Sequence, residues 1–535
     1  MEEEINEAKP CLVQTAQGFT VSYKEKLLYS KYNPSKAILQ SIQKLEILPQ
    51  TVILCVSPVL PYGLKELNQK LPQDSVMLAC EYDSKLYDFI LQNNKKDFEE
   101  LKNFSFLSRE QLLDLGPLLL NMNKGFRRII RLDFSAGAQF YSPLYDKVTE
   151  NAANALMTFW ANRVTLVKFG RKYSTNFFKN LAFSSKTEPI QKYFAAIEKP
   201  IIVFGAGESL QAGVKMLKEK AGGSRDFFIL CADTALQPLL AQNIIPDGVF
   251  IEEAQNVICK SFIGAQKCSC HIFAGLSSLH SITRYFEPEQ LSFFMTEFTQ
   301  ANFIKRFDEA GILPPKNKPF GSVGITAWYY ANIFRKDSSI PIYTYGLDFS
   351  YSAGRTHTKG AMADNARFMT SNRIKNDANY AAAFCEPAFK KGAMFTTPIL
   401  QRYADLMTAL RQAQEPQIQA QGPQIQAQEP QFQSGGADAY SGVPDAQSGV
   451  PEPVEGLDKI SLTLEQEAKA LQELKSILTG DKKIASDKIE QTITELIQDK
   501  EYLYLHFPDG HKFQYTQSFL NRVRVEVDYF LKVIS

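Results

Sequence analysis

Short apolar runs bounded by turn residues recur along most of the chain, and each is followed by apolar residues at helical spacing. The run Ile201–Phe204 is rich in β-branched residues and is bounded by Pro200 and Gly205, which is typical of a strand buried in a parallel sheet. Behind it, apolar positions recur with a helical period from Leu210 onward. Because strand and helix alternate in this way, we predict an α/β fold whose centre is a Rossmann-like domain with a mostly parallel sheet.

A glycine turn joins this first central strand to its helix. Gly205 and Gly207 flank a single alanine, and Ser209 stands where the N-cap of the helix belongs. A helix that follows a strand and a glycine turn offers backbone N–H groups to phosphate at its N-terminus. We therefore predict nucleotide binding at this turn, with a purely structural corner as the alternative.

Polar residues follow the next two predicted strands of the central domain. Asp233 and Thr234 come after the first of them, before a short helix expected at 236–242, and Glu253 and Gln255 come after the second. The carboxyl ends of parallel strands meet at one edge of a sheet, where α/β proteins bind their ligands. These four side chains are therefore predicted to contact a ligand in one crevice.

Two later segments add candidate chemistry. A helix is expected to open after Gly321, and Ser322 is placed either to cap it or to contact a ligand, so Gly321 and Ser322 are both candidate ligand-binding residues. A later strand ends in a loop that contains Asp348, Tyr351 and His357. Of the five histidines, His357 alone sits in a polar loop after a strand, where a pKa near neutrality suits a general base. We predict that this loop carries catalytic residues.

The expected elements group into five segments. The turn Ser57–Gly63 after the first strand lacks the glycine pattern that cradles a pyrophosphate, so the N-terminal domain is predicted to be structural or to bind a partner, with cofactor binding as the less favoured alternative. Proline in each repeat of a seven-residue period excludes a coiled coil ahead of the last segment. The predicted segments are an N-terminal α/β domain (1–150), a helical connection (151–195), the central Rossmann-like domain (196–400), a disordered linker of Gln-, Pro- and Gly-rich repeats (411–456) and a helical C-terminal module (457–535) with helices at 462–478, 485–500 and 517–534.

Charge and cysteine usage narrow the possible functions. The 59 Lys and Arg residues balance 58 Asp and Glu residues, which argues against nucleic acid or an anionic membrane as the main partner. The acidic N-terminus does not resemble a signal peptide, and no apolar run approaches the roughly eighteen residues of a membrane span, so we expect a cytoplasmic protein without one. The eight cysteines are expected to be free thiols. Cys259, Cys268, Cys270 and His271 lack paired metal-ligand spacing, so no metal site is expected.

Five motifs follow one another in the order GAGESL, CADTAL, IPDGVFIEEAQ, GSVGITA and YGLDFSYSAGRTHTKG. In this set the chain resembles the motility accessory factor (Maf) family of flagellin glycosyltransferases, which shares its core with 6-hydroxymethylpterin diphosphokinase MptE-like proteins. The resemblance covers about residues 195–390, and more weakly the region around 29–37. The same core is similar to bacterial sialyltransferases that use CMP-activated nonulosonic acids.

The resemblance implies a function and a set of roles. The implied activity is transfer of a pseudaminic or legionaminic acid from a CMP donor to Ser and Thr hydroxyls of flagellin, in support of flagellum assembly and motility, without a metal or a further cofactor. By position, Gly205, Gly207 and Ser209 would hold the donor phosphate, Asp233 and Ser322 would hold ribose, base or sugar carboxylate, and Tyr351 would assist the leaving phosphate.

Two alternatives remain open from the sequence. One is pyrophosphoryl transfer from ATP to a hydroxymethylpterin, with Mg²⁺ held by Asp233, Glu253 or Asp348. The other is a non-catalytic flagellar assembly factor, because Glu208 stands where the family usually has proline and its charge would oppose an incoming phosphate.

Overall fold

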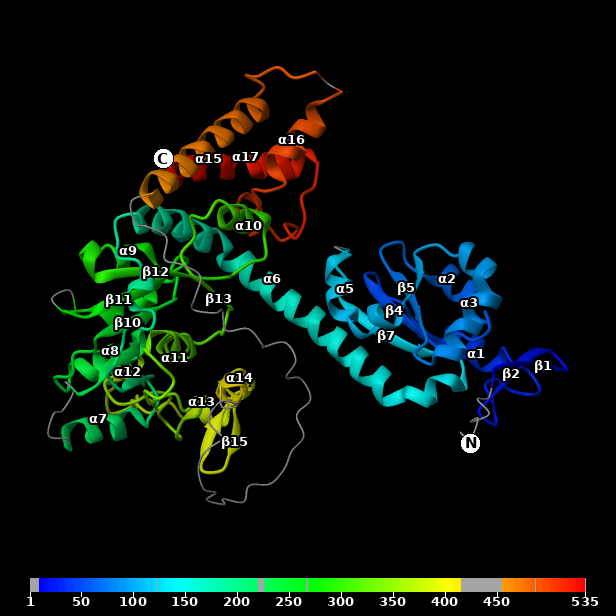
Figure 1. Cartoon of the computed structure of the whole chain (residues 1–535), viewed down its shortest axis with the longest axis horizontal. Coiled ribbons are helices and arrows are strands. Elements are labelled where there is room, and N and C mark those ends of the chain that lie inside the picture. The colour runs from blue at the N-terminus through cyan, green and yellow to red at the C-terminus, as the bar shows by residue number, and fades with distance from the viewer. Residues whose placement is uncertain are drawn as a thin grey trace, which may run out of the picture. The chain divides into compact units, whose positions relative to one another are not determined.

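A computed structural model describes residues 9–122, 124–219, 226–265, 268–414, 455–485 and 487–534 (Figure 1). The chain divides into two compact units. The first comprises Met1–Lys168 with Phe507–Lys512, and the second comprises Phe169–His506 with Phe513–Ser535. The long helix α6 (Ser142–Ser184) contributes residues to both.

The first unit is built around a four-stranded parallel sheet in the order β6-β5-β4-β7. The strand expected at 51–56 is β4, and it is buried along its whole length because both faces of the sheet are covered by helices. An antiparallel sheet of β1, β2 and β3 precedes it. The bounds are β1 Cys11–Thr15, β2 Gly18–Tyr23, β3 Lys26–Leu27, α1 Lys36–Lys44, β4 Thr51–Val56, α2 Leu64–Lys70, β5 Val76–Cys80, α3 Ser84–Glu99, β6 Phe104–Phe106, α4 Arg109–Leu113, α5 Leu115–Asn121 and β7 Arg128–Asp133.

Polar side chains fill the carboxyl edge of this first sheet. The Ser57 hydroxyl donates a short hydrogen bond to the buried Glu81 carboxylate, which also accepts from the Tyr145 hydroxyl at 3.0 Å and from the Asp83 N–H at 2.9 Å. Burial raises the pKa of Glu81. The Ser135 hydroxyl bonds the Ser57 carbonyl at 2.7 Å. The position at which an open α/β sheet would hold a cofactor is thus occupied by the protein's own hydrogen-bonded groups.

The second unit contains a seven-stranded sheet in the order β13-β12-β11-β10-β9-β8-β14, and every neighbouring pair is parallel. This confirms the predicted Rossmann-like centre. The chain places successive strands outward from β8 and then returns to add β14 on the opposite side, so the strand order reverses between β8 and β14. The strands are β8 Ile201–Phe204, β9 Phe228–Ala232, β10 Gly248–Ile251, β11 His271–Gly275, β12 Leu291–Thr296, β13 Lys316–Asn317 and β14 Ile342–Tyr345.

Helix α11 (Val323–Phe334) covers one face of this sheet and closes an aromatic core. Phe250 of β10 stacks on Phe273 of β11 at a centroid distance of 4.8 Å and on Tyr330 of α11 at 5.6 Å. Two corrections to the expected elements bear on the site. Helix α8 (Asp233–Leu240) begins three residues earlier than predicted, directly at the end of β9, so Asp233 lies in its first turn. The helix α6 begins at Ser142, within the segment assigned to the N-terminal domain and three residues before the helical pattern expected from Tyr145, because its apolar face already packs in the first core.

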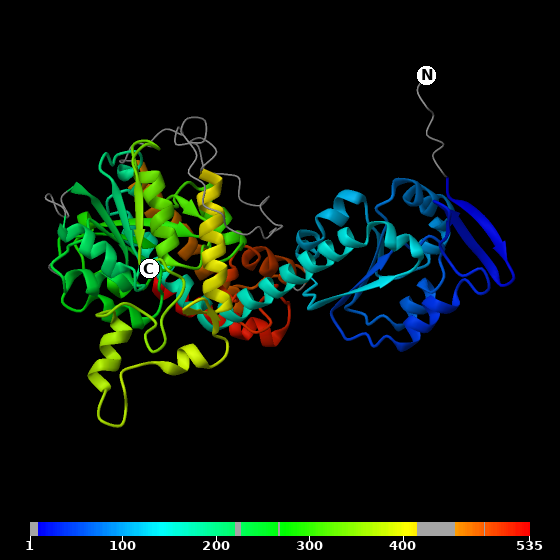
Figure 2. The ribbon, with the colours of Figure 1, turned by 90° about the horizontal axis from the view of Figure 1, so that it is seen from below.

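The remaining helices of the second unit lie around the sheet and in the C-terminal region (Figures 1 and 2). The predicted helix at 517–534 is confirmed; the one predicted at 462–478 begins seven residues earlier, and the one predicted at 485–500 is shorter. Residues 415–454, most of the predicted linker, lie outside the described residues, and both predicted linker ends are helical. The bounds are α7 Leu210–Glu219, α9 His280–Thr283, α10 Asn302–Glu309, α12 Met362–Thr370, α13 Tyr380–Phe384, β15 Phe389–Lys391, β16 Met394–Thr396, α14 Pro398–Gln414, α15 Glu455–Thr479, α16 Ile489–Ile497 and α17 Gln517–Ile534.

Charged side chains attach the C-terminal helices to α10 within the second unit. The Glu501 carboxylate accepts from the backbone N–H groups of Asn302 at 2.8 Å and Phe303 at 3.2 Å, which caps the N-terminus of α10. One turn later, Arg306 bonds Glu467 at 2.8 Å and Asp499 at 2.9 Å. The C-terminal region is therefore joined to the second unit through named side chains.

Candidate functional site

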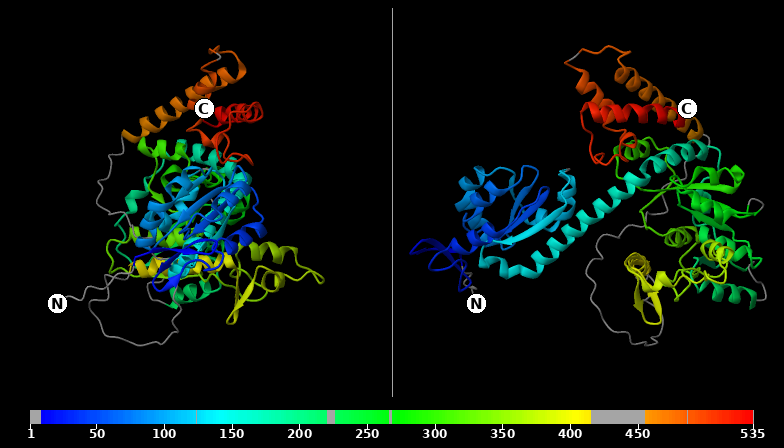
Figure 3. Two further views of the ribbon diagram at one scale, coloured as in Figure 1. Left: turned by 90° about the vertical axis from the view of Figure 1, so that its right-hand side faces the viewer. Right: turned by 180° about the vertical axis from the view of Figure 1, so that it is seen from behind.

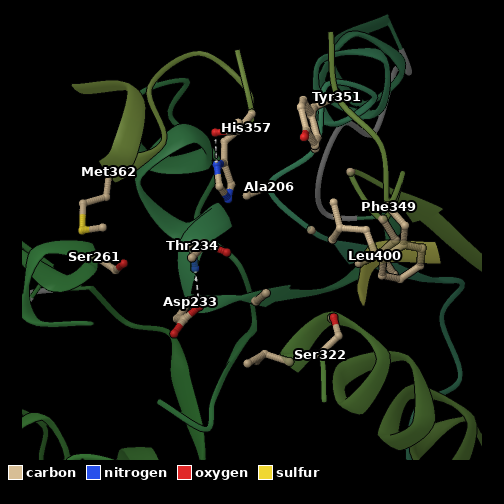
Figure 4. Close-up of a pocket in the computed structure, with 18 of the residues that line it drawn as sticks. Ala206, Asp233, Thr234, Ser261, Ser322, Phe349, Tyr351, His357, Met362 and Leu400 are labelled. Carbon is tan, nitrogen blue, oxygen red and sulfur yellow. Dashed lines mark hydrogen bonds between the residues drawn. The ribbon is translucent and has the colours of Figure 1, made fainter. Parts of the chain in front are cut away.

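A pocket of about 330 Å³ lies at the carboxyl edge of the seven-stranded sheet, where β8 and β14 are neighbours. This is the point at which the strand order reverses, and open α/β sheets bind ligands at such points. Figure 4 shows side chains from several loops and helices converging on the hollow. The lining includes eight residues singled out from the sequence: Gly205, Gly207, Asp233, Thr234, Glu253, Ser322, Tyr351 and His357.

Two glycine turns cross at the base of this pocket. The N–H of Gly207 donates to the carbonyl of Gly346 at 2.8 Å. A Cβ added to Gly205 would lie 2.3 Å from the Gly346 oxygen, and a Cβ added to Gly346, whose φ is +71°, would lie 2.1 Å from the Gly205 oxygen. The crossing therefore requires glycine on both sides whether or not a ligand is present. Contact of Gly205 and Gly207 with a donor phosphate stays a prediction.

Asp348 and Ser209 lock the two turns together. The Ser209 hydroxyl donates a short hydrogen bond to the Asp348 carboxylate, which also accepts the Ser209 N–H at 2.9 Å. The same hydroxyl accepts the Gly346 N–H at 2.7 Å. The capping role expected of Ser209 at α7 thus belongs to Asp348, because its carboxylate takes a free N–H at the positive end of the helix. Neither residue is part of the pocket lining.

Gln255 and Gly321 also lie apart from the lining. The backbone N–H of Gln255 donates to Glu253 at 2.7 Å, which orients that carboxylate. Gly321 has a φ of +76° and lies against Tyr403, where an added Cβ would be 2.7 Å from the ring. Both residues shape the site through a neighbour rather than by facing the hollow.

His357 is held in the wall of the pocket by the loop after β14. Its Nδ1 lies 3.0 Å from the Thr356 hydroxyl, and its ring is drawn toward Ala206 and Thr234 in Figure 4. Burial lowers the pKa of His357, and the nearby Asp364 only partly offsets this effect. The imidazole is therefore neutral at neutral pH, which is the form that accepts a proton.

Tyr351 lies on the opposite side of the hollow in Figure 4. Its hydroxyl donates to the backbone carbonyl of Ala382 at 2.5 Å, and its backbone N–H donates to the Phe395 carbonyl at 2.9 Å. Burial raises the pKa of Tyr351. The phenol is thus protonated and anchored, and assistance to a leaving phosphate would require it to exchange its bond to Ala382.

Asp233 and Glu253 are the acidic residues of the lining. Asp233 is 5% exposed, and one of its oxygens accepts the Thr234 N–H at 2.6 Å. Burial, together with the charges of Glu253 and Glu252, raises the pKa of Asp233 to about 7. The buried Glu252 carboxylate is satisfied by the hydroxyls of Thr296 and Thr326 at 2.5 and 2.8 Å, so its role is structural.

The lining contains no lysine or arginine among the described residues. Its polar character comes instead from hydroxyl groups and from the N-terminus of α11. Ser322 makes no side-chain capping bond to α11, so the capping role expected for it is wrong, and its hydroxyl faces the pocket beside the first-turn residues Val323 and Gly324. The positive end of a twelve-residue helix is the strongest attraction for an anion that this lining offers.

Several lining residues were not singled out from the sequence. The apolar part of the lining includes Val257, Ile258, Phe349, Met362 and Leu400. They come from elements far apart in the chain, and nothing in their local pattern distinguishes them from core positions. Ser350 and Thr356 were detectable only as part of the polar loop around His357.

The remaining sequence-based expectations concern metal, thiols and membrane. All eight cysteines are free thiols. His271 bonds the Ser292 hydroxyl at 2.8 Å, and burial lowers its pKa to about 4. Within the described ranges, no three His, Cys, Asp or Glu side chains gather as a potential metal site. Across the same ranges, no helix combines the length and the apolar character needed to cross a membrane.

The central part of the chain matches a known family. Residues 175–354 match the model described as "6-hydroxymethylpterin diphosphokinase MptE-like", and this segment holds every strand of the seven-stranded sheet. The central segment is thus an MptE-like domain. A Treponema pallidum (strain Nichols) protein, described as "Uncharacterized protein", is 30% identical over 556 aligned residues that cover 98% of this chain and 95% of the relative. The chain therefore belongs to one family with this Treponema pallidum protein, and its residues 175–354 form an MptE-like domain.

A solved structure, "Structure of MAf glycosyltransferase from Magnetospirillum magneticum AMB-1", aligns with 98% of this chain and 91% of its own. The TM-score is 0.49 and the sequence identity is 13%.

Proposed function

We propose that this protein is a glycosyltransferase that moves a nonulosonic acid of the pseudaminic or legionaminic type from a CMP donor to Ser and Thr hydroxyls of flagellin. The observation that carries the proposal is the pocket at the β8–β14 reversal, which combines a neutral imidazole with hydroxyl groups and a helix N-terminus and has no Lys or Arg in its described lining. Family membership supports a nucleotide substrate.

The charge of the pocket favours a donor with a single phosphate. A CMP-linked sugar brings one phosphodiester charge and one carboxylate charge, whereas ATP brings several charges close together. Without cationic side chains in the lining, a triphosphate is repelled in this partly desolvated site by Glu253, and also by Asp233 when that group is ionised. The N–H groups at the start of α11 and the Ser322 hydroxyl are placed to hold a singly charged group.

His357 supplies the chemistry that a hydroxyl acceptor needs. As the hydroxyl oxygen attacks the anomeric carbon and the bond to the phosphate breaks, its proton has to leave, and a neutral imidazole takes it. Ser350 and Tyr351 line the same pocket, and Tyr351 contacts the departing phosphate by exchanging its bond to Ala382.

Glu208 does not oppose this proposal. Its carboxylate accepts a short hydrogen bond from the Ser352 hydroxyl and a longer one from the Ser352 N–H at 3.3 Å. It is not among the residues that line the pocket. The charge that motivated a non-catalytic assembly factor is thus directed away from the donor.

Pyrophosphoryl transfer from ATP is the second candidate, favoured by one observation. Asp233 and Glu253 both line a pocket without cationic side chains, and Mg²⁺ is bound by carboxylates together with substrate phosphates. Asp348 is not available for that task because its carboxylate is bonded to Ser209.

Calorimetric titration separates the two candidates. The full chain is titrated with CMP and with ATP, each in the presence of Mg²⁺ and in EDTA. CMP binding that persists in EDTA, followed by a mass increase of flagellin incubated with the CMP-sugar, is the expected result. Binding of ATP that strictly requires Mg²⁺, with no CMP binding, would overturn the proposal.

Asp233 makes stability depend on pH in a predictable direction. Its folded pKa of about 7 lies above its usual value of 3.8, so the folded protein binds more protons than the unfolded chain between these values. The free energy of unfolding contributed by this group therefore falls as pH rises through this window, by on the order of a few kcal/mol. Asp233→Asn lacks this titrating group. As pH rises from about 5 to about 8, the free energy of unfolding should therefore fall more in the wild type than in the variant. Denaturant unfolding at each pH measures it, and parallel curves for the two proteins would contradict it.

A further inference from the structure

The segment that follows the His357 loop exposes large apolar side chains. Residues 365–377 are all exposed, and α12 buries none of its nine residues. Figures 2 and 3 show α12 and α13, in yellow-green, projecting from the body of the second unit. We name residues 362–384 the arm. Its most exposed apolar residues are Phe368 (69%), Met369 (84%), Ile374 (95%), Tyr380 (54%) and Phe384 (68%).

Such a surface is unusual for a short helix. A nine-residue helix gains little stability in water by itself and normally depends on packing of its apolar face. Contiguous exposed apolar side chains on a protein surface mark sites where another molecule binds. The arm therefore has the character of a face that is covered by a partner.

The base of the arm adjoins a second pocket of about 460 Å³. Arg355, Lys359, Asp364 and Asp377 line it, so it presents both positive and negative charges. It is lined also by Glu208, Gln211, Ser352, Ala353, Gly354, Thr358 and Ala378.

The two pockets share a wall. At three places, neighbouring residues of the chain line different pockets. The first residue of each pair lines the first pocket and the next lines the second: Gly207 and Glu208, Tyr351 and Ser352, and His357 and Thr358. Thr358 fixes this wall because its N–H donates to the Ala206 carbonyl at 2.8 Å and its hydroxyl accepts from Gln211 at 2.9 Å. An occupant of the second pocket lies within one loop of His357.

We propose that the arm and the second pocket together bind the acceptor polypeptide. The inference rests on the proposed function and names how its acceptor is recognised. The apolar face of the arm binds apolar side chains of the acceptor, and the second pocket takes charged or polar residues next to the hydroxyl that is modified. The acceptor is favoured over a second copy of this chain because the arm and the second pocket are continuous with the wall that carries His357. An acceptor hydroxyl has to reach this wall.

The test uses the full chain with Phe368→Ser, Met369→Ser and Ile374→Ser combined. We expect its affinity for flagellin, and its kcat/KM for flagellin, to fall about tenfold to a hundredfold, with the change mainly in KM. Its CMP affinity and its release of CMP from the donor in the absence of flagellin should match the wild type, because none of the three residues lines the first pocket. The control is Leu462→Ser with Val525→Ser, two residues of the C-terminal helices that are 54% and 57% exposed. It should leave flagellin affinity unchanged.

A second variant tests the charged pocket. Asp377→Lys reverses one charge in the second pocket without touching the first, and we expect it also to weaken flagellin binding. Unchanged flagellin affinity in the triple variant, or an equal loss in the control, would overturn the proposal. So would conversion of a wild-type oligomer to a monomer by the triple variant, since the partner of the arm would then be a second copy. Flagellin binding is measured without turnover, so a protein that binds flagellin through the arm but does not bind CMP would refute the proposed activity and leave this inference standing.

Discussion

Replacing His357 by glutamine should lower the rate of transfer to flagellin about a hundredfold to ten-thousandfold, the range typical for loss of a general base. Affinity for CMP should stay within a few-fold, because the donor phosphate is expected at the α11 N-terminus rather than at the imidazole. Single-turnover transfer, followed by the mass of flagellin, measures the rate.

The pH profile distinguishes this role from a structural one. Burial lowers the pKa of His357, so the basic form already predominates at neutral pH and the wild-type rate should fall only on the acid side, below the usual histidine range. The glutamine variant should lack that fall. His280→Gln is the control, because the His280 ring bonds Asn180 at 2.8 Å and is not part of the pocket lining. Transfer at the wild-type rate in His357→Gln would refute the assignment.

Gly346→Ala should destabilise the second unit by on the order of 3–5 kcal/mol. Two costs add. A side chain at a φ of +71° costs about 1–2 kcal/mol, and the added Cβ would lie 2.1 Å from the Gly205 carbonyl oxygen, so the two crossing turns would have to separate. The midpoint of denaturant unfolding measures the loss.

Gly392 offers a matched control for the backbone cost alone. It has a φ of +61° in the hairpin between β15 and β16, and an added Cβ meets no atom within 4 Å. Gly392→Ala should therefore cost only about 1–2 kcal/mol. Equal losses in the two variants would mean that the crossing of the turns contributes nothing beyond backbone strain.

The strands of the central sheet could be predicted because each buried strand is a short run of apolar residues. Ile201–Phe204 is predicted and observed with the same bounds, since a four-residue β-branched run between proline and glycine has few other uses. The order of the strands could not be predicted in the same way. The strand order depends on which edge of the sheet is still unpaired when β14 is added. The sequence of a single strand does not contain this information.

The candidate site divides along a similar line. Asp233 and Glu253 could be identified because a polar residue just after a buried strand is locally unusual, and His357 because it is the one histidine in a polar loop that follows a strand. The partner of Ser209 could not, because Asp348 lies 139 residues away and the N-cap position alone does not say which carboxylate will fill it. The apolar lining residues could not be identified either; Leu400, for example, belongs to a helix outside the strand pattern.

The absence of lysine and arginine from the described lining bears on selectivity. An anion held by N–H groups and hydroxyls is bound through directed hydrogen bonds, so its position is fixed more closely than by a flexible ammonium group. A pocket of this kind discriminates by the shape and charge count of its ligand, which is consistent with the proposed preference for a CMP-linked sugar over ATP.

The six residues Phe507–Lys512 belong to the first unit although they come from near the end of the chain. The ring centroids of His511 and Trp160 are 6.1 Å apart, and a Cβ added to Gly125 would lie 3.4 Å from His511 Nε2. Arg163 donates a hydrogen bond to the Phe507 carbonyl at 2.9 Å. The first unit is therefore complete only after residue 512 has been synthesised. A C-terminal truncation that removes Phe507–Lys512 would therefore damage the first unit even if it left the predicted linker intact. Expressing the first 168 residues alone would leave the Trp160 side of the first unit uncovered.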